Sequence, residues 1–455
     1  MGDYRRIADR IADDIAAGRL APGEQLPTQR AFARRRRIAV STAGRVYGEL
    51  VRRGLVVGEV GRGTFVRAAP VPSGRALAEP SALAPVNLEL NYPSAPGQSE
   101  LLAAGLAPLL RPETLAESLR TASAEGTAAA REAAAALLAT PGWSPAPSRL
   151  LFAGNARQAV AGALASLVRP GGRVGVESLT YPLVKDIAAR LGIVLVPLAM
   201  DEEGLRPDAL AAAHRGSPLS AVYVQPTLHN PTSLTAGTGR RAELAATVRQ
   251  LDLPVVEDRI WSFLHEGEEL LAAFAPERTH VVDGLSKRVA PGLTAGFLVV
   301  PEGRQEQVAR ALRSGGWTAA RFALEAVVRW TGAGTVDRLV TAKRADAERR
   351  QRLAARHLDG FAVRADPRAY YVWWRLPAPW RADTFTAAAA RHGIAVTPGP
   401  AFHVAGSRSG PAAGRAGVPQ IATAADAVRL GLASVPPPEL ARALRTLAEV
   451  ARSAP

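Results

Sequence analysis

The first apolar pattern in the chain has a helical period. Ile7, Ile11 and Ile15 recur every four residues between charged positions, and the pattern stops at Gly18. This spacing places the three isoleucines on one face of a helix, which the pattern predicts over the first 17 or so residues. The sequence LAPGEQLP then interrupts the chain.

Two shorter helices and a hairpin are predicted next. Thr28 is a suitable N-cap for a helix that runs to about Arg36, and a third helix runs from about Ser41 to Gly54. The following LVVGEVGRGTFV contains two β-rich pieces around a glycine-rich turn. Three helices and a hairpin in fewer than 70 residues predict a winged helix-turn-helix.

The pattern changes after a linker. Residues 68–86 are rich in proline, alanine and serine and show no periodicity. Beyond them, strand-like pieces (RVGVES, AVYVQP, LPVVED, HVVDGL) alternate with helix-length segments rich in Ala, Arg and Leu. This alternation predicts an α/β fold with a mostly parallel sheet covered by helices. The predicted domains are therefore residues 1–67 and residues 87–455, joined by the linker.

Composition removes several classes of function. The chain has 455 residues, 47 % of them apolar, which is enough for more than one core. It has no cysteine, so disulfides and thiolate metal sites are excluded, and its seven histidines show no paired spacing, so no metal is expected. The start carries charges and no stretch reaches 18 apolar residues, so we expect a cytoplasmic protein with no membrane partner.

The net charge of +15 points to a polyanionic partner. Residues 1–67 hold 14 arginines against 7 acidic residues, about half of the excess in a small part of the chain. Two other interpretations remain open: arginine is favoured throughout an Ala-, Gly- and Pro-rich composition, and the RRRR at 34–37 is a solvated helix end. The concentration of this charge in residues 1–67 favours double-stranded DNA as the partner.

In a helix-turn-helix, the N-terminal part of the third helix enters the major groove. This geometry would place Ser41, Thr42 and Arg45 against base edges, and arginines of the second helix against the phosphates. An arginine at the tip of the wing would reach a minor groove or a phosphate. The residues predicted to contact DNA are Arg30, Arg36, Arg37, Ser41, Thr42, Arg45 and Arg62.

Three motifs in this region carry a family resemblance. The order PGEQLPTQRAFA, STAGRVYGELVRRGL, GRGTFV resembles the GntR family of bacterial regulators over residues 1–67. The chain departs from it where the family usually has a serine-arginine pair opening the recognition helix, because Ala39 and Val40 stand there. Arg37 and Arg45 are the candidates to take over the lost contact.

A second candidate site lies in the α/β part. Only three of the 56 basic side chains are lysines, at positions 185, 287 and 343. Asn230 follows AVYVQP, Asp258 closes LPVVED, and Lys287 follows HVVDGL. Ligands gather beyond the carboxyl ends of strands in open α/β sheets. Each residue alone is more simply a helix cap or a surface residue, whereas the three together predict a binding site.

This set suits pyridoxal phosphate, because a lysine forms a Schiff base with its aldehyde and a carboxylate keeps its pyridine nitrogen protonated. GLSKRVAPGLTAGFLV, HNPT, VVED and VRLGLAS resemble motifs of class I aminotransferases of fold type I over about 87–455. The resemblance implies Lys287 as the catalytic Schiff-base lysine, Asp258 at the pyridine nitrogen and Asn230 at the phenolic oxygen. It also implies Arg429 for a substrate carboxylate and Tyr181 stacked on the cofactor.

One segment resembles the part of the family's site that binds the phosphate of the cofactor. AGNARQAV resembles the loop that binds phosphate through backbone N–H groups at a helix N-terminus, which places Asn155, Ala156 and Arg157 there. Asn155 stands where glycine is usual, and asparagine tolerates the left-handed conformation that a glycine there suggests. Ser286, beside the lysine, completes the cofactor-binding set.

Other family residues of this region are missing. Gly284 and Thr294 stand where the family usually has a hydroxyl residue and an arginine for the phosphate, so Arg157 or Arg288 would have to supply the charge. The tyrosine expected shortly after the strand-end acid is also absent, because the chain reads EDRIWSF.

A GntR-type head fused to an aminotransferase-like domain is the arrangement of the MocR subfamily. It implies a homodimeric transcription regulator in which pyridoxal phosphate, or its adduct with a small amine or amino-acid effector, changes how two heads meet an operator. Two alternatives stay open: an active pyridoxal phosphate-dependent aminotransferase, and a regulator whose degenerate pocket no longer binds the cofactor.

Overall fold

The computed structural model describes residues 3–16, 19–20, 24–52, 55–59, 63–66, 84–265, 267, 269–404 and 424–453. Arg62 and most of the predicted linker lie outside the described residues. Val86, the last residue of the predicted linker, pairs with Ile394 in a short two-stranded parallel sheet.

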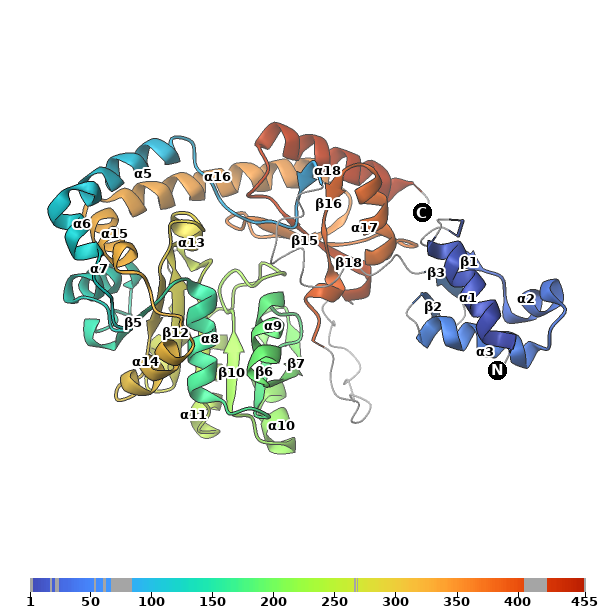
Figure 1. The fold of residues 1–455 in the computed structure, drawn as a ribbon, viewed down its shortest axis with the longest axis horizontal. Helices are drawn as coiled ribbons and strands as arrows, with labels where there is room; N and C mark the ends of the chain where they lie inside the picture. Colours follow the sequence, from blue (N-terminus) through green and yellow to red (C-terminus); the bar gives the residue numbers. More distant parts are fainter. Residues whose placement is uncertain are drawn as a thin grey trace.

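The N-terminal head has the predicted three helices and hairpin, blue in Figure 1. Thr28 caps the second helix, as expected, because its Oγ1 accepts a hydrogen bond from the N–H of Ala31 at 3.2 Å. A two-residue strand that the sequence pattern did not indicate pairs with the hairpin and gives the sheet order β1-β3-β2. The elements are α1 (Asp3–Ala16), β1 (Gln25–Leu26), α2 (Gln29–Arg36), α3 (Val40–Arg52), β2 (Val56–Glu59) and β3 (Gly63–Val66).

The α/β part is built on a seven-stranded sheet, as the alternating pattern predicts (Figure 1). All its strands run parallel except β13, which pairs antiparallel with both neighbours. In sheet order they are β5 (Leu150–Ala153), β13 (Gly296–Val299), β12 (Thr279–Gly284), β11 (Val255–Asp258), β10 (Ala221–Val224), β6 (Arg173–Glu177) and β7 (Val194–Leu198).

Helices cover both faces of this sheet because its strands are apolar on both sides. In β10, Ala221 and Tyr223 belong to one core, whereas Val222 and Val224 belong to the opposite one. The first face packs against α8 (Ala156–Leu167), α9 (Pro182–Leu191) and α14 (Gln305–Ser314). The second face packs against α10 (Pro207–Gly216), α11 (Thr238–Gln250), α12 (Leu271–Phe274), α7 (Ala128–Leu138), α15 (Arg321–Gly332) and α16 (Thr335–His357).

A smaller antiparallel sheet, of order β14-β15-β18-β17, forms the C-terminal part with two helices on it. Its elements are β14 (Ala362–Arg364), β15 (Tyr371–Arg375), β17 (Thr397–Pro398), β18 (Ala427–Gly431), α17 (Ala382–Arg391) and α18 (Pro437–Arg452). The remaining elements are β4 (Val86–Asn87), β16 (Ile394–Ala395), α5 (Gln98–Leu106), α6 (Pro112–Ser118), α13 (Leu285–Arg288), β8 (Met200–Asp201) and β9 (Gly204–Leu205). Short 3₁₀ turns cover Ala107–Leu110, Pro147–Arg149, Ser262–Leu264, Gly399–Ala401 and Ala424–Asp426.

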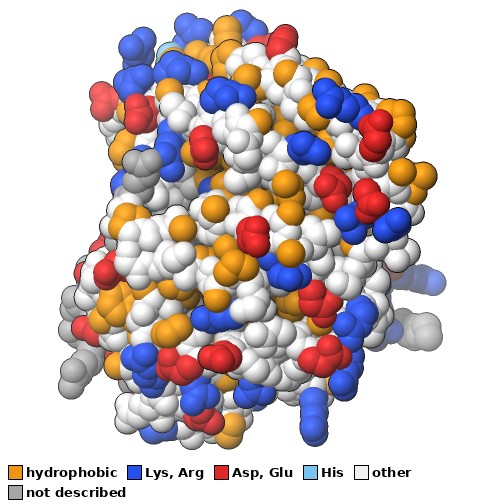
Figure 2. Space-filling model, turned by 90° about the vertical axis from the view of Figure 1, so that its left-hand side faces the viewer, with side chains coloured by type: hydrophobic (Ala, Val, Ile, Leu, Met, Phe, Trp, Pro, Cys, Tyr) orange, Lys and Arg blue, Asp and Glu red, His pale blue; other side chains and the backbone are white. Residues whose placement is uncertain are grey.

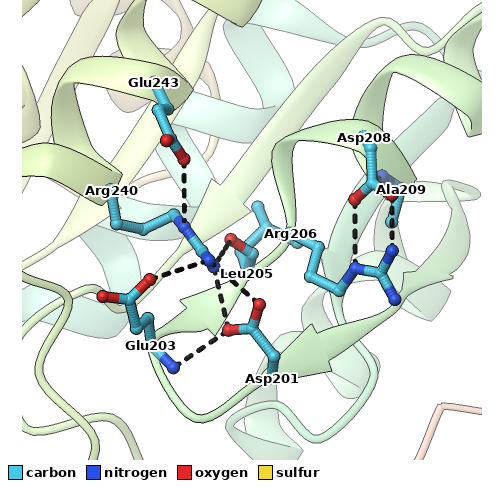
Figure 3. Close-up of polar contacts among 8 residues, drawn as sticks. All are labelled: Asp201, Glu203, Leu205, Arg206, Asp208, Ala209, Arg240 and Glu243. Atoms are coloured by element: carbon cyan, nitrogen blue, oxygen red, sulfur yellow. Dashed lines mark hydrogen bonds and ion pairs between the residues drawn. The ribbon is translucent and has the colours of Figure 1, made fainter. Parts of the chain in front are cut away.

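An acidic hairpin, β8–β9, is tied to α11 by one arginine (Figure 3). Arg240 donates to both carboxylate oxygens of Asp201 at 2.9 Å, to Glu203 at 3.0 Å and to the carbonyl of Leu205 at 3.0 Å. Glu243 lies 3.4 Å from its Nε. All these acids face one guanidinium, so the cluster has a structural role.

The surface seen from the α6 and α7 side mixes both charge signs (Figure 2). No helix among the described residues is long and apolar enough to cross a membrane. In the same part of the chain, no group of three or more His, Asp and Glu side chains is arranged to hold a metal ion.

Candidate functional site

The predicted strand-end residues meet in one pocket. The strands β10, β11 and β12 are neighbours in the sheet, so Asn230, Asp258 and Lys287 come together beyond their carboxyl ends. Arg429, on β18 of the smaller sheet, closes the pocket from the other side. All nine residues predicted for cofactor and substrate line it: Asn155, Ala156, Arg157, Tyr181, Asn230, Asp258, Ser286, Lys287 and Arg429.

Lys287 is the third residue of the short helix α13 and points into the pocket. Its Nζ donates to the carbonyl of Asn91 at 2.7 Å and lies 4.2 Å from the ring centre of Tyr92 and 5.1 Å from that of Trp261. Burial, followed by the positive charges of Arg429 and other basic groups, lowers the pKa of Lys287 to about 7. A lysine of this kind is partly neutral near pH 7 and able to act as a nucleophile.

Asp258 is held rigidly at the end of β11. Its Oδ2 accepts hydrogen bonds from the hydroxyl of Tyr223 at 2.6 Å and from Nε2 of Gln225 at 3.0 Å, and its Oδ1 accepts from the N–H of Ile260 at 3.0 Å. Burial raises the pKa of Asp258, and these three hydrogen bonds oppose the shift. A cationic ring nitrogen placed beside it would stabilise the carboxylate further.

Arg429 is buried, with only 4 % of its surface exposed. Its guanidinium donates to Thr397 Oγ1 at 3.1 Å, to the carbonyl of Glu89, and over 3.5 Å to Asn230 Oδ1. Burial lowers its pKa to about 10, and its Nε has no hydrogen-bond partner among the described residues. A buried N–H group without an acceptor lowers the free energy of unfolding. The pocket therefore suits a ligand that offers an acceptor, such as a carboxylate.

Asn155, at the N-terminus of α8, lines the pocket, and its backbone conformation differs from the expected one. Asn155 has φ −162° and ψ 172°, so it is extended and not left-handed, and the expectation drawn from its place in a glycine position is wrong. Its side chain is the N-cap of α8, because Oδ1 accepts from the N–H of Gln158 at 3.0 Å. A Cβ at Gly296 would lie 2.3 Å from the carbonyl oxygen of Asn155, so β13 must be glycine where it passes this helix end.

The two departures near the lysine have a local explanation. A Cβ added at Gly284 would lie 2.8 Å from the backbone oxygen of Ala295, so the hydroxyl residue usual in the family does not fit this backbone. Thr294 faces Ser286 instead, with 2.9 Å between their hydroxyl oxygens. Ser286 therefore lines the pocket with its hydroxyl partly engaged.

Arg288 does not supply the missing phosphate charge. Its guanidinium forms a buried ion pair with Asp283, 2.6 Å long, and it does not line the pocket. Of the two arginines considered as substitutes, the structure brings only Arg157 to the pocket.

Lys343 supports the backbone of the segment that carries Lys287. Its fully buried amine donates to the carbonyls of Lys287 at 2.9 Å, Arg288 at 3.0 Å and Val289 at 2.6 Å. Burial lowers the pKa of Lys343 to about 7, but three carbonyl acceptors favour the ammonium, because a neutral amine has only two N–H groups. One of the three lysines thus fixes the position of another.

Replacing Lys343 with methionine should destabilise the protein by roughly 3 kcal/mol, because three carbonyls lose a charged donor. Urea unfolding would measure the change in the free energy of unfolding. Lys185→Met is the matched control, since that amine also bonds backbone carbonyls, at Ala401 and His403, but is only partly buried and supports no pocket residue. Equal losses in the two variants would contradict a special role of Lys343.

The head presents the predicted DNA residues on one helix-turn-helix. Phe32 of α2 and Tyr47 of α3 pack edge to face with ring centres 5.4 Å apart, and the Tyr47 hydroxyl donates to the carbonyl of Pro27 at 2.5 Å. Arg37 ends α2 in a left-handed conformation, φ 53°, with its N–H directed at the carbonyls of the last turn. Arg30, Arg36, Arg37, Ser41 and Arg45 are exposed and Thr42 is partly exposed.

The sequence did not reveal four aromatic and amide residues that line the pocket or hold its carboxylate. Tyr92 and Trp261 flank the lysine amine, and Tyr223 and Gln225 hold Asp258. Tyr223 and Gln225 alternate in AVYVQP, so they share a side of the strand that leads to the site, and this alternation is the one signal that was present.

These features define a transcription regulator in which a helix-turn-helix head precedes an aminotransferase-like domain, the MocR-type arrangement. The chain belongs to the family Aminotransferase class I and II, which it matches over residues 93–447, and residues 3–66 match Bacterial regulatory proteins, gntR family.

The similar proteins include transcriptional regulators and aminotransferases. The HTH-type transcriptional regulator YdeF of Bacillus subtilis is 28 % identical over 405 residues, covering 89 % of this chain and 87 % of YdeF. The HTH-type pyridoxine biosynthesis transcriptional regulator PdxR of Corynebacterium glutamicum is 27 % identical over 305 residues, 65 % of each chain. The α-aminoadipate aminotransferase LysN of Thermus thermophilus has the same fold, with a TM-score of 0.72 and 20 % identity over 85 % of this chain and 95 % of LysN.

Proposed function

We propose that the pocket binds pyridoxal phosphate through Lys287 and that an amine effector regulates DNA binding there. The observation that carries this proposal is the convergence of a lysine amine, a strand-end carboxylate, an amide and a buried arginine on one pocket. When bound, the cofactor supplies an aldehyde that condenses with amines and an electron-poor ring. The name of the relative PdxR links that protein to pyridoxine biosynthesis.

The residues fit the cofactor at both ends. Asp258, fixed by three hydrogen bonds, would hold the proton of the pyridine nitrogen, and Asn230 would donate to the phenolic oxygen. The N–H groups of Ala156 and Arg157, in the first turn of α8, have no acceptor within the helix and would receive the phosphate together with the Arg157 guanidinium. Tyr181, at the start of α9, would lie against the ring.

The pKa of Lys287 predicts how cofactor capture depends on pH. The neutral amine is the reactive form, and it makes up about half of the population at pH 7 and about nine-tenths at pH 8. The rate at which the full-length protein captures added pyridoxal phosphate should therefore rise up to about pH 7 to 8 and then level off. Stopped-flow absorbance would measure it. A rate that still rises tenfold per pH unit above pH 9 would show an unperturbed lysine and contradict this role.

Arg429 favours an effector that carries a carboxylate as well as an amine. An amine that replaces Lys287 on the cofactor would be held most firmly if it also carried a carboxylate, because Arg429 keeps a buried donor for it. This makes an amino acid the preferred effector class. A working aminotransferase is the alternative, and turnover of an amino acid and a keto acid by the purified protein distinguishes the two.

The first residues after the linker connect this pocket to the head in sequence. Arg429 donates to the carbonyl of Glu89 and Lys287 to that of Asn91, so both groups that would meet the effector hold the same short segment. A ligand that draws either group away removes a hydrogen bond from residues 89–91. We therefore expect DNA affinity to change when pyridoxal phosphate and an amino acid are added together, as measured by fluorescence anisotropy.

We also propose that the large domains form a homodimer, which presents two heads to an operator with half-sites one or more helical turns apart. Leu110, Leu115 and Leu119 are exposed large apolar residues that a second copy would cover. Light scattering at micromolar concentration would test it, and a monomer would count against it. A protein that binds an operator would act in the cytoplasm.

A further inference from the structure

We propose that Val40, exposed at the start of the recognition helix, reads the methyl group of a thymine in the major groove. Val40 is the first residue of α3 and half of its surface, 50 %, is exposed. The N-terminal residues of such a helix are the ones that reach base edges. This inference rests on the proposed binding of the head to DNA.

The stability of the head does not explain why a valine stands at position 40. The core of the head uses Ala43, Val46, Tyr47 and Leu50 from α3, and Val40 is not part of it. A β-branched residue lowers helix propensity relative to alanine, and Ala39 before it is a poor N-cap. The start of α3 thus has a poor N-cap and a β-branched first residue, and neither of them belongs to the core of the head.

The chemistry of Val40 selects one base. An arginine in this place would read guanine through its O6 and N7 acceptors, whereas a valine has neither donor nor acceptor. The only apolar group that a base offers in the major groove is the C5 methyl group of thymine. The exposed Arg37, three residues before Val40, would hold the helix end against the phosphates.

The test removes that methyl group from the DNA and leaves the protein unchanged. The full-length protein selects its best sites from a randomised duplex pool, and each thymine of a selected site is then replaced singly by deoxyuridine. One thymine in each half-site should weaken binding roughly fourfold, the value expected for the loss of one methyl group from apolar contact. Deoxyuridine at the other thymines should have little effect.

Protein variants identify the contact. Val40→Ala should remove the sensitivity to deoxyuridine at that position, and Val40→Arg should change the base selected there from thymine to guanine. The matched control is Val51→Ala, because Val51 is 47 % exposed on the same helix but lies near its C-terminal end. That variant should keep the thymine sensitivity of the parent.

The outcomes separate this inference from the proposed function. If selective DNA binding occurs but no thymine is sensitive, or if Val40→Ala keeps the sensitivity, the assignment of Val40 is wrong and DNA binding stands. If the full-length protein binds neither selected nor random duplex, the proposed function fails, and the inference fails with it.

Discussion

Lys287→Ala should yield a protein in which borohydride traps no pyridoxal phosphate. Covalent capture needs a neutral amine inside the pocket, and burial together with nearby positive charge gives Lys287 a pKa of about 7. The other two lysines have different tasks: Lys343 is fully buried on three carbonyls, and Lys185 bonds the backbone of residues 401 and 403. Neither lines the pocket. Mass spectrometry of the reduced, digested protein would measure trapping at each lysine.

The controls for this result use the same protein preparation. Affinity of the variant for DNA without cofactor should stay within a few fold of the parent, because Lys287 is not in the head. Lys185→Ala should trap cofactor as the parent does. Cofactor found on Lys185 or Lys343 of the parent, or on none with excess pyridoxal phosphate, would refute the assignment and favour a degenerate pocket.

The strand-end residues were predictable because the rule that places them depends only on topology. Three parallel strands that follow one another in sequence bring their carboxyl ends to one edge, and β10, β11 and β12 proved to be neighbours. Asn230, Asp258 and Lys287 therefore meet as expected. The helices and hairpin of the head were predictable for a similar reason, because apolar period, caps and glycines determine them locally.

The rest of the pocket depends on contacts that no local pattern contains. Asn91 and Tyr92 meet Lys287 across 196 and 195 positions of the chain. Lys343 lies in the long charged helix α16, where its sequence context is that of a surface lysine although it is fully buried. Arg288 adjoins Lys287, yet the turn of α13 directs it to Asp283 and not to the phosphate end.

Replacing four head arginines with glutamine should weaken DNA binding on the order of a thousandfold near physiological salt, because each phosphate contact displaces a condensed counterion. The slope of log affinity against log salt should fall by as much as about 3.6, four contacts at about 0.9 each. These arginines are exposed and lie on α2 or directly after it. They are Arg30, Arg34, Arg36 and Arg37.

A control variant decides whether this loss comes from contacts or from total charge. Four exposed arginines of the large domain, changed to glutamine, give the same net charge, +15 − 4 = +11. They are Arg310, Arg352, Arg356 and Arg391. Because screening leaves distant surface charges with little effect at this salt concentration, the control should lose less than about tenfold in affinity and keep its salt slope. Equal losses in the two variants, measured by anisotropy on the same duplex across a salt series, would mean that general positive charge and not the helix-turn-helix binds DNA.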